Sequence, residues 1–327
     1  MKRQNKLKPL CIILSIFILL SCDNFIKSEA EKNFEETFML IQNKSVKKND
    51  LDWNDLKKTV RNSVKNINDN DDFNLAIAYT IKLVNDGHSK ILASKKTNDN
   101  KTKKSNSNKL DIPVIKTKIL EKNIGYIKLS GTNHITDNKL IEKYTLEIRK
   151  ALLGLDKSEE LSGWILDLRT HGGGRLSCES LGLAPLFDNP LVGIYLNNKN
   201  NYNEITCTNQ DFKYGNQLQE SLTYNSTLLN KNKKIAILID KKTASSGEFL
   251  ALAFKFQNNS KTFGKQTIGM TSHLAFYELK SGAILFLAQS YYYDINRNLI
   301  KEGIIPDVEC DSEKSISKAM DWIKNGI

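Results

Sequence analysis

Cysteine and histidine are scarce in this chain, with five and four copies among 327 residues. Cys11 and Cys22 lie in or beside an N-terminal apolar run, which leaves Cys178, Cys207 and Cys310. Three is an odd number, and the spacing fits neither a disulfide framework nor a metal-ligand cluster. One disulfide with a free thiol, or three unpaired and mostly buried thiols, would both fit this pattern. We predict no metal ion and no cofactor.

Long apolar runs are also missing, except for PLCIILSIFILLS near the N-terminus, which is too short for a comfortable membrane span. The basic segment MKRQNKLK precedes it, as in a secretion signal. The run ends in LLSC, which resembles the bacterial lipobox, whose cysteine is acylated and becomes the mature N-terminus. We therefore expect a lipoprotein signal peptide over residues 1–21, lipid on Cys22 and a lipid-anchored, extracytoplasmic protein of the bacterial cell envelope. The alternative is an ordinary signal peptide with a chance cysteine.

Of the formal net charge of +11, four units lie in residues 1–21, and the remaining +7 comes largely from lysine- and asparagine-rich loops that lack aromatic residues, such as SKKTNDNKTKKSNSNK. Lysines without interleaved aromatics favour solvation or contact with anionic surfaces over nucleic-acid recognition. We predict no nucleic-acid partner. The same stretch has no hydrophobic periodicity, so residues 94–110 are predicted to be a polar linker or loop.

The remaining chain has two different patterns of apolar residues. After a short tether at residues 22–29, apolar residues recur at helical spacing over residues 30–93, which predicts a small helical domain. Over residues 111–327, short apolar runs such as GWILDL and KIAILID alternate with helical segments, as in an α/β domain. The expected core residues of the helical part are Phe34, Phe38, Ile41, Trp53, Leu56, Val60, Val64, Phe73, Ile77, Ile81 and Val84.

The hexapeptide TASSGE, residues 243–248, stands where a strand is expected to give way to a helix. Ser245 and Glu248 have the spacing of a capping box, in which each side chain satisfies a free backbone N–H of the first turn. A serine on such a turn is also exposed, close to backbone N–H groups that can hold an oxyanion. The hexapeptide alone leaves both interpretations open.

A second expected strand, GWILDL, leads into three consecutive glycines, residues 172–174. Such a loop presents backbone N–H groups to an anion. It lacks the Lys-Ser or Lys-Thr of a phosphate loop and the spaced glycines of a dinucleotide fold. An oxyanion hole is the favoured functional interpretation, and a plain tight turn is the structural one.

Six blocks in this order resemble the C-terminal processing peptidases, or tail-specific proteases, and their tricorn-like relatives. The blocks are DGHS (86–89), GYIKLSG (125–131), DLRTHGGG (167–174), TASSGE (243–248), GKQTIGMTS (264–272) and EGIIPDV (302–308). The resemblance implies an α/β serine peptidase with a spiral β-β-α core like those of Clp protease and crotonase. Its substrates would be peptides or unfolded proteins. Family members often carry a PDZ domain before the catalytic core, but too few residues follow the DGHS block for one here.

The resemblance also assigns residues. Ser245 matches the nucleophile, and the backbone N–H groups of Gly173 and Ser246 match the oxyanion donors. Met270 stands where one branch of the family has its lysine base, and a methionine cannot accept a proton. This implies the tricorn-like branch, in which His88 would be the base, with Lys265 as the competing candidate.

The group that would orient the base is Glu302, although it is displaced by two positions from the usual glutamate. Asp86 and Glu248 are its competitors. Three further histidines lie in or near these blocks: His134, His171 and His273. The predicted function is a membrane-anchored serine endopeptidase that works through an acyl-enzyme on Ser245. The alternative is an inactive lipoprotein of the same fold that binds peptides or a protein partner, and the oligomeric state stays open.

Overall fold

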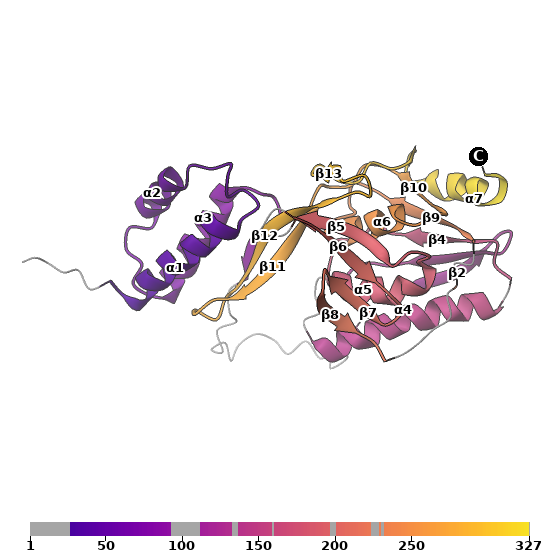
Figure 1. Ribbon diagram of the computed structural model, residues 1–327, viewed down its shortest axis with the longest axis horizontal. Helices are drawn as coiled ribbons and strands as arrows, with labels where there is room; N and C mark the ends of the chain where they lie inside the picture. Colours follow the sequence, from indigo (N-terminus) through magenta and orange to yellow (C-terminus); the bar gives the residue numbers. More distant parts are fainter. Residues whose placement is uncertain are drawn as a thin grey trace, which may run out of the picture.

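The structure, a computed structural model, has a helical lobe and a larger α/β lobe (Figure 1). It describes residues 27–92, 112–132, 137–158, 160–196, 201–223, 229 and 232–326. The predicted signal peptide, Cys22, the whole of the predicted polar linker and His134 lie outside these residues. Among the residues inside them, no helix has the length and apolar character needed to cross a membrane, and no PDZ domain is evident.

The helical lobe consists of α1 (Glu29–Lys44), α2 (Trp53–Ser63) and α3 (Asn70–Val84). Each begins at a capping side chain, Ser28, Asp52 or Asp69, that accepts backbone N–H groups of the first turn. Every apolar residue predicted for the core of this lobe is buried. The helical periodicity of residues 30–93 is therefore confirmed.

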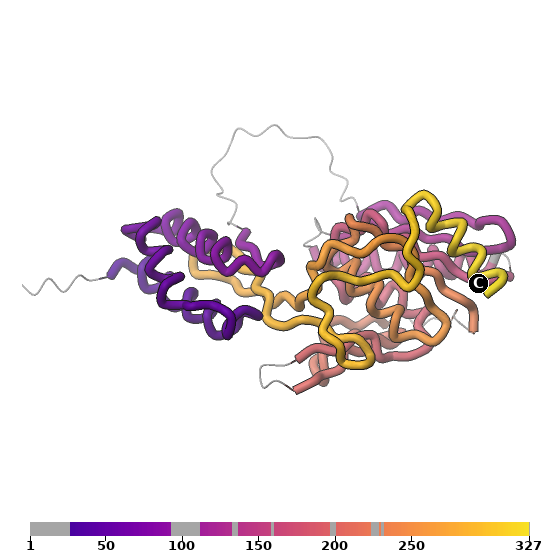
Figure 2. Tube along the Cα trace, turned by 90° about the horizontal axis from the view of Figure 1, so that it is seen from above, coloured from indigo at the N-terminus to yellow at the C-terminus, as the bar shows by residue number. Residues whose placement is uncertain are grey.

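The core of the helical lobe also contains residues from far along the chain. A long hairpin of β11 (Ser272–Glu278) and β12 (Ile284–Tyr293) runs between the two lobes, and Figure 2 shows it extending between the helices. Leu279, Leu285 and Leu287 of this hairpin are buried in one cluster with the apolar faces of the three helices. Short helices gain most of their stability from such packing, so the hairpin completes this lobe.

The α/β lobe is built on a six-stranded sheet in the order β14-β10-β9-β4-β3-β2. Its strands are β2 (Lys116–Leu120), β3 (Ile124–Lys128), β4 (Gly163–Asp167), β9 (Lys234–Ile239), β10 (Ser260–Gly264) and β14 (Val308–Glu309). All neighbours are parallel except β2 and β3. Helices α4 (Asn138–Ser158), α5 (Leu176–Leu183) and α6 (Ser246–Lys255) cover one face, and α7 (Ser315–Asn325) covers the other. The predicted α/β class is confirmed.

A second sheet has the order β1-β12-β5-β6-β7-β8, with β11 and β13 also pairing with β12. Its remaining strands are β1 (Lys90–Leu92), β5 (Leu191–Leu196), β6 (Tyr202–Cys207), β7 (Asp211–Tyr214), β8 (Gln217–Ser221) and β13 (Leu299–Ile300). A short 3-10 helix, Ala184–Leu186, follows α5.

Cys178, Cys207 and Cys310 are all free thiols, and the first two are buried, so the interpretation without a disulfide holds for them.

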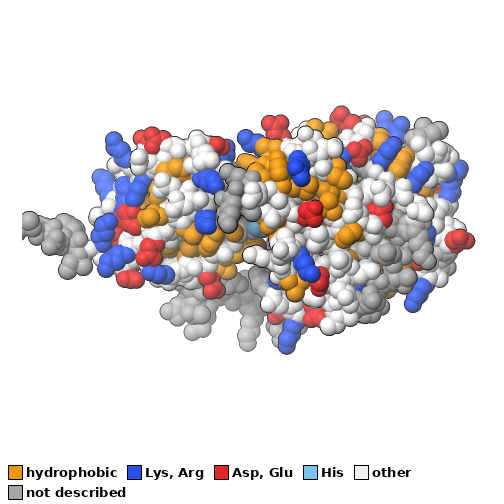
Figure 3. All heavy atoms as spheres, in the orientation of Figure 1, with side chains coloured by type: hydrophobic (Ala, Val, Ile, Leu, Met, Phe, Trp, Pro, Cys, Tyr) orange, Lys and Arg blue, Asp and Glu red, His pale blue; other side chains and the backbone are white. Residues whose placement is uncertain are grey.

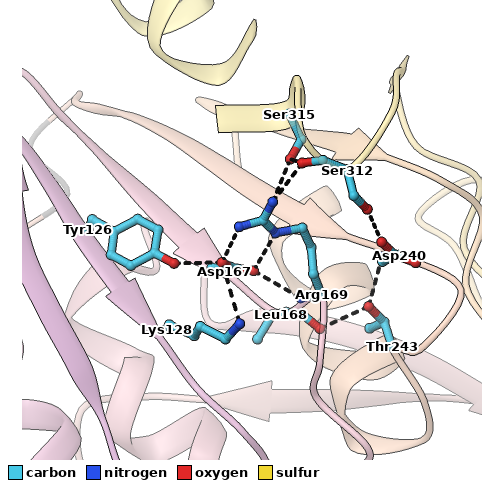
Figure 4. Close-up of polar contacts among 9 residues, drawn as sticks. All are labelled: Tyr126, Lys128, Asp167, Leu168, Arg169, Asp240, Thr243, Ser312 and Ser315. Carbon is cyan, nitrogen blue, oxygen red and sulfur yellow. Dashed lines mark hydrogen bonds and ion pairs between the residues drawn. The ribbon is translucent and has the colours of Figure 1, made fainter. Parts of the chain in front are cut away.

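A buried ion pair fixes the end of β4 (Figure 4). The guanidinium of Arg169 donates to both carboxylate oxygens of Asp167, at 2.9 and 2.6 Å, and Tyr126 donates to the same carboxylate at 2.6 Å. Arg169 also donates to the Ser312 carbonyl at 2.6 Å and to the Ser315 hydroxyl at 3.2 Å. Burial opposes the charge on Asp167, but the bonds from Arg169 and Tyr126 outweigh it, and its pKa lies below the usual value. The pair joins the loop after β4 to the start of α7.

Asp167→Asn should lower the free energy of unfolding by about 3 kcal/mol, because the charge of Arg169 would lose its carboxylate partner. Urea unfolding at pH 7 measures this loss. Because the folded-state pKa of Asp167 is lowered, its contribution is present above about pH 4 and is lost as pH falls through the folded pKa. The difference between variant and wild type should therefore shrink in acid. Glu147→Gln, which removes an exposed pair with Lys150, is the control and should cost under about 0.5 kcal/mol; equal losses in the two variants would contradict the prediction.

Candidate active site

The candidate site lies where three neighbouring parallel strands end. The strands β3, β4 and β9 are adjacent, so their carboxyl ends meet at one edge of the sheet. The loop after β4 carries the three glycines, and the loop after β9 carries TASSGE. His171 in the first loop accepts the backbone N–H of Ala244 at 2.9 Å through its carbonyl oxygen. The two blocks that the sequence set apart are thus in direct contact.

Ser245 stands at the N-terminus of α6 with φ 53° and ψ −118°, a backbone conformation that non-glycine residues rarely adopt. Such strain is typical of a serine held out of a sharp strand-to-helix turn. Glu248 stabilises the turn by accepting the Ser245 N–H at 2.9 Å, as the predicted capping box requires. The hydroxyl of Ser245 faces His88. The Glu248 half of the capping box and a half-buried serine hydroxyl that faces His88 therefore coexist at one turn.

Glu248 is fully buried and holds a second segment as well. Its carboxylate accepts the Thr267 hydroxyl at 2.5 Å and the backbone N–H groups of Gly269 and Met270, each at 2.8 Å. Burial raises the pKa of this carboxyl, although the hydrogen bonds oppose the shift. Since all of these contacts go to the Ser245 turn and to residues 267–270, Glu248 supports the nucleophile turn and does not orient His88.

His88 reaches the site from the helical lobe, on the turn between α3 and β1. The carboxylate of Asp86 accepts the backbone N–H groups of His88 and Ser89, at 2.9 and 2.7 Å. The hydroxyl of Ser89 accepts the N–H of Ala288 on β12 at 2.9 Å, which joins the turn to the hairpin. In the space-filling view, histidine atoms are visible at the junction of the two lobes (Figure 3). Asp86 thus shapes the turn that presents the imidazole.

Both ring nitrogens of His88 have hydroxyl partners. Nε2 lies 3.0 Å from Ser245 Oγ, and Nδ1 lies 2.7 Å from Ser272 Oγ. When Nε2 accepts the Ser245 proton, Nδ1 carries the ring proton and donates it to Ser272. Burial lowers the pKa of His88 to about 4, helped by the positive charge of Lys90 and opposed by Asp86 and Ser272. The imidazole is therefore neutral at pH 7 and can accept a proton.

One sequence prediction needs correction at this point, and one competing candidate loses its support. Glu302 is exposed, and its backbone carbonyl, which accepts the Gln266 amide at 2.8 Å, faces the neighbouring segment. Ser272 takes the place at His88 Nδ1 that was predicted for Glu302. The ammonium of Lys265 contacts the carboxylates of Asp311 and Glu309, at 3.3 and 3.5 Å, which raise its pKa. A base needs the opposite shift, so the geometry does not support Lys265.

The predicted oxyanion donors lie on the two loops in contact. Gly173 adopts φ 101°, which favours glycine, and its carbonyl accepts the N–H of Thr132 at 3.0 Å. Its N–H donates to Nδ1 of His171 at 3.3 Å. Ser246 is the first residue of α6, where helical N–H groups have no partner within the helix. Both residues thus lie on the two loops that contact each other next to Ser245.

The other histidines have different surroundings. His171 is fully buried within the glycine loop. His273 packs against the rings of Tyr195 and Tyr214, with centroids 5.9 and 4.7 Å away, and burial lowers its pKa to about 4. Sequence reasoning missed Ser272, whose only signal was its place as the last residue of the GKQTIGMTS block.

Comparisons with known proteins show the family to which the chain belongs. The model of peptidase family S41 matches residues 123–310, more than half of the chain. The chain belongs to peptidase family S41. The predicted kinship with C-terminal processing peptidases is confirmed, whereas its assignment to a branch without the lysine stays a prediction.

Two curated proteins illustrate which sequences this S41 member is similar to. A nisin-resistance protein of Lactococcus lactis is 33% identical over 172 residues, 51% of each chain. A probable CtpA-like serine protease of Staphylococcus aureus is 28% identical over 209 residues, 64% of this chain and 39% of the relative. The chain thus spans about half or less of the length of these relatives.

Solved structures show the same fold. A lipoprotein from Streptococcus agalactiae superposes with a TM-score of 0.74 at 23% identity and covers 91% of this chain and 97% of its own. The photosystem II D1 C-terminal processing protease superposes with a TM-score of 0.59 at 14% identity and covers 88% and 94%. At these identities the likeness establishes the fold alone.

Proposed function

We propose that this S41 member is a membrane-anchored, extracytoplasmic serine endopeptidase that cleaves peptides or unfolded proteins through an acyl-enzyme on Ser245. The observation that carries the proposal is the 3.0 Å contact between His88 Nε2 and Ser245 Oγ. A nucleophile and a base within hydrogen-bond reach, with the base held by a third group, form the usual arrangement for nucleophilic catalysis. Here Ser272 is that third group.

In the proposed reaction, Ser245 Oγ attacks the scissile carbonyl carbon as its proton passes to His88 Nε2. The backbone N–H groups of Gly173 and Ser246 stabilise the oxyanion. The C–N bond then breaks, and His88 gives the proton to the leaving amine. Water, deprotonated by His88, hydrolyses the ester and returns the free serine. His88 Nδ1 keeps its own proton throughout and donates it as a hydrogen bond to Ser272 Oγ, so the ring does not rotate between steps.

A fluorophosphonate probe tests this proposal directly, because it labels serines that are activated as nucleophiles. Wild-type protein should label at Ser245 and cleave an unstructured peptide. Protein that is folded but neither labels nor cleaves would contradict the proposal and support the alternative, an inactive fold that binds peptides.

For the substrate, we propose small peptides that the protein meets outside the cytoplasm. The support is the L. lactis relative, whose name connects it with nisin resistance. Nisin is therefore the first peptide to test, by mass spectrometry after incubation with wild type and with Ser245→Ala. New fragments with wild type alone would support this substrate class, and intact nisin beside a cleaved unstructured peptide would contradict it.

The membrane anchor is the last part of the proposal and rests on the LLSC motif. Cys22→Ala should leave a chain that incorporates no fatty acid and no longer partitions with membranes, because the polar segment after residue 22 cannot supply the hydrophobic binding. Metabolic labelling with a fatty acid and fractionation measure both effects. Cys310→Ala, which removes a free thiol of the catalytic lobe, is the control and should stay lipidated. Lipid that persists in Cys22→Ala would overturn the anchor.

A further inference from the structure

A buried carboxylate lies directly behind the proposed oxyanion hole. Glu179 on α5 is fully buried, and so is His171 on the glycine loop, whose Nε2 is 3.2 Å from Glu179 Oε1. The same oxygen accepts the hydroxyl of Thr132 at 3.2 Å, and the second oxygen accepts the hydroxyl of Ser246 at 2.8 Å. A buried charge is costly unless polar groups surround it. Here those groups all come from segments that border Ser245.

Each partner of Glu179 leads to one oxyanion donor. Ser246 is itself the second proposed donor, and its side-chain hydroxyl is held at Glu179. Thr132 donates its N–H to the Gly173 carbonyl at 3.0 Å and accepts the Arg175 N–H at 2.6 Å through its hydroxyl. It therefore holds the loop on both sides of residue 174. One carboxylate thus connects the two donor segments.

His171 connects to the first donor through its other nitrogen. Nδ1 accepts the N–H of Gly173 at 3.3 Å, so the ring proton lies on Nε2, toward Glu179. The ring is closely packed: a Cβ on Gly247 would lie 2.7 Å from Nδ1, and a Cβ on Gly131 would lie 3.2 Å from the ring and 2.4 Å from the Gly173 carbonyl. Side chains at either glycine would displace the ring, so the fold leaves room for it between the glycine loop and the nucleophile turn.

We propose that Glu179 and His171 are positioning residues of the oxyanion hole, an inference that rests on the proposed peptidase function. In the resting protein, Nδ1 of His171 accepts a long hydrogen bond from the Gly173 N–H. A tetrahedral oxyanion is a stronger acceptor and draws that N–H away without moving the rest of the loop. Glu179 holds Thr132 and Ser246 by hydrogen bonds and lies against Nε2 of His171, so the segments that carry both donors are in place before substrate arrives.

The first test is Glu179→Gln, which keeps the shape of the side chain but removes its charge. We expect kcat to fall about 10- to 100-fold, below the loss from deleting an oxyanion donor itself, while KM stays within about twofold. The rate of fluorophosphonate labelling should fall by a similar factor, because the phosphonyl oxygen occupies the oxyanion position. Glu220→Gln is the matched control, since Glu220 contacts Ser177 and Arg175 farther from Ser245, and it should keep wild-type values.

The second test separates the two nitrogens of His171. The amide oxygen of asparagine can take the place of Nδ1 and accept the Gly173 N–H, whereas glutamine reaches the place of Nε2. We expect His171→Asn to retain more kcat and faster labelling than His171→Gln at similar thermal stability. Equal losses in the two variants, or wild-type labelling in Glu179→Gln, would overturn the inference while wild type stays active. A wild type that neither labels nor cleaves would overturn the proposed function and this inference with it.

Discussion

Ser245→Ala is expected to lower peptide cleavage by at least three orders of magnitude while the protein stays folded. The hydroxyl is the atom that forms the acyl-enzyme, and loss of a nucleophile removes the whole covalent route. Its contribution to the stability of the helix terminus is small by comparison, about 1 kcal/mol. Cleavage assays and thermal unfolding of the same preparation measure both quantities.

Ser246→Ala is the matched control for this result. It keeps the backbone N–H that serves as oxyanion donor and loses only the hydroxyl bound to Glu179. We expect it to retain a substantial part of the activity, because the hydrogen bond that it loses, worth about 1.5–3 kcal/mol at most, does not involve a reacting atom. Equal losses in the two variants, or a Ser245→Ala protein that is merely unstable, would count against Ser245 as the nucleophile.

His88→Ala should cause a loss nearly as large, because no other described side chain with a suitable pKa contacts the Ser245 hydroxyl. Residues that act as a unit lose most of their effect when either is removed. Lys265→Ala is the control and should keep wild-type kcat/KM, since its ammonium pairs with Asp311 and Glu309. Full activity in His88→Ala together with loss in Lys265→Ala would overturn the assignment.

The pH profile gives a second readout of the same base. His88 accepts a proton only when neutral, so activity is present above its pKa and falls as pH drops through it. The sequence alone suggested a decline below about pH 6.5, the usual pKa of histidine. Burial lowers the pKa of His88 to about 4, so we expect kcat/KM to stay level well below pH 6.5. Circular dichroism at each pH separates this decline from acid unfolding, and a decline that already begins near pH 8 would indicate a lysine base.

The sequence by itself determined the local parts of this protein. Helical periodicity gave the apolar faces of α1, α2 and α3, and the strand-turn-helix pattern gave the glycine loop and TASSGE. These features depend on hydrogen bonds and side-chain spacing within a few residues, which one sequence shows directly. That the two loops meet depends in addition on the sheet order, which places β4 beside β9 and so brings their carboxyl ends to one edge.

Only the tertiary structure decided which side chains meet at the site. His88 and Ser245 are 157 positions apart and come from different lobes, which the β11–β12 hairpin joins by completing the core of the helical lobe. That packing places Ser272, the first residue of the hairpin, at His88 Nδ1, while Glu302 faces solvent. A hydrogen bond forms or fails over less than 1 Å, and a loop position shifted by two residues moves a side chain farther than that. The partner of a catalytic group therefore depends on how the packed lobes fix its neighbours, which spacing along the chain does not record.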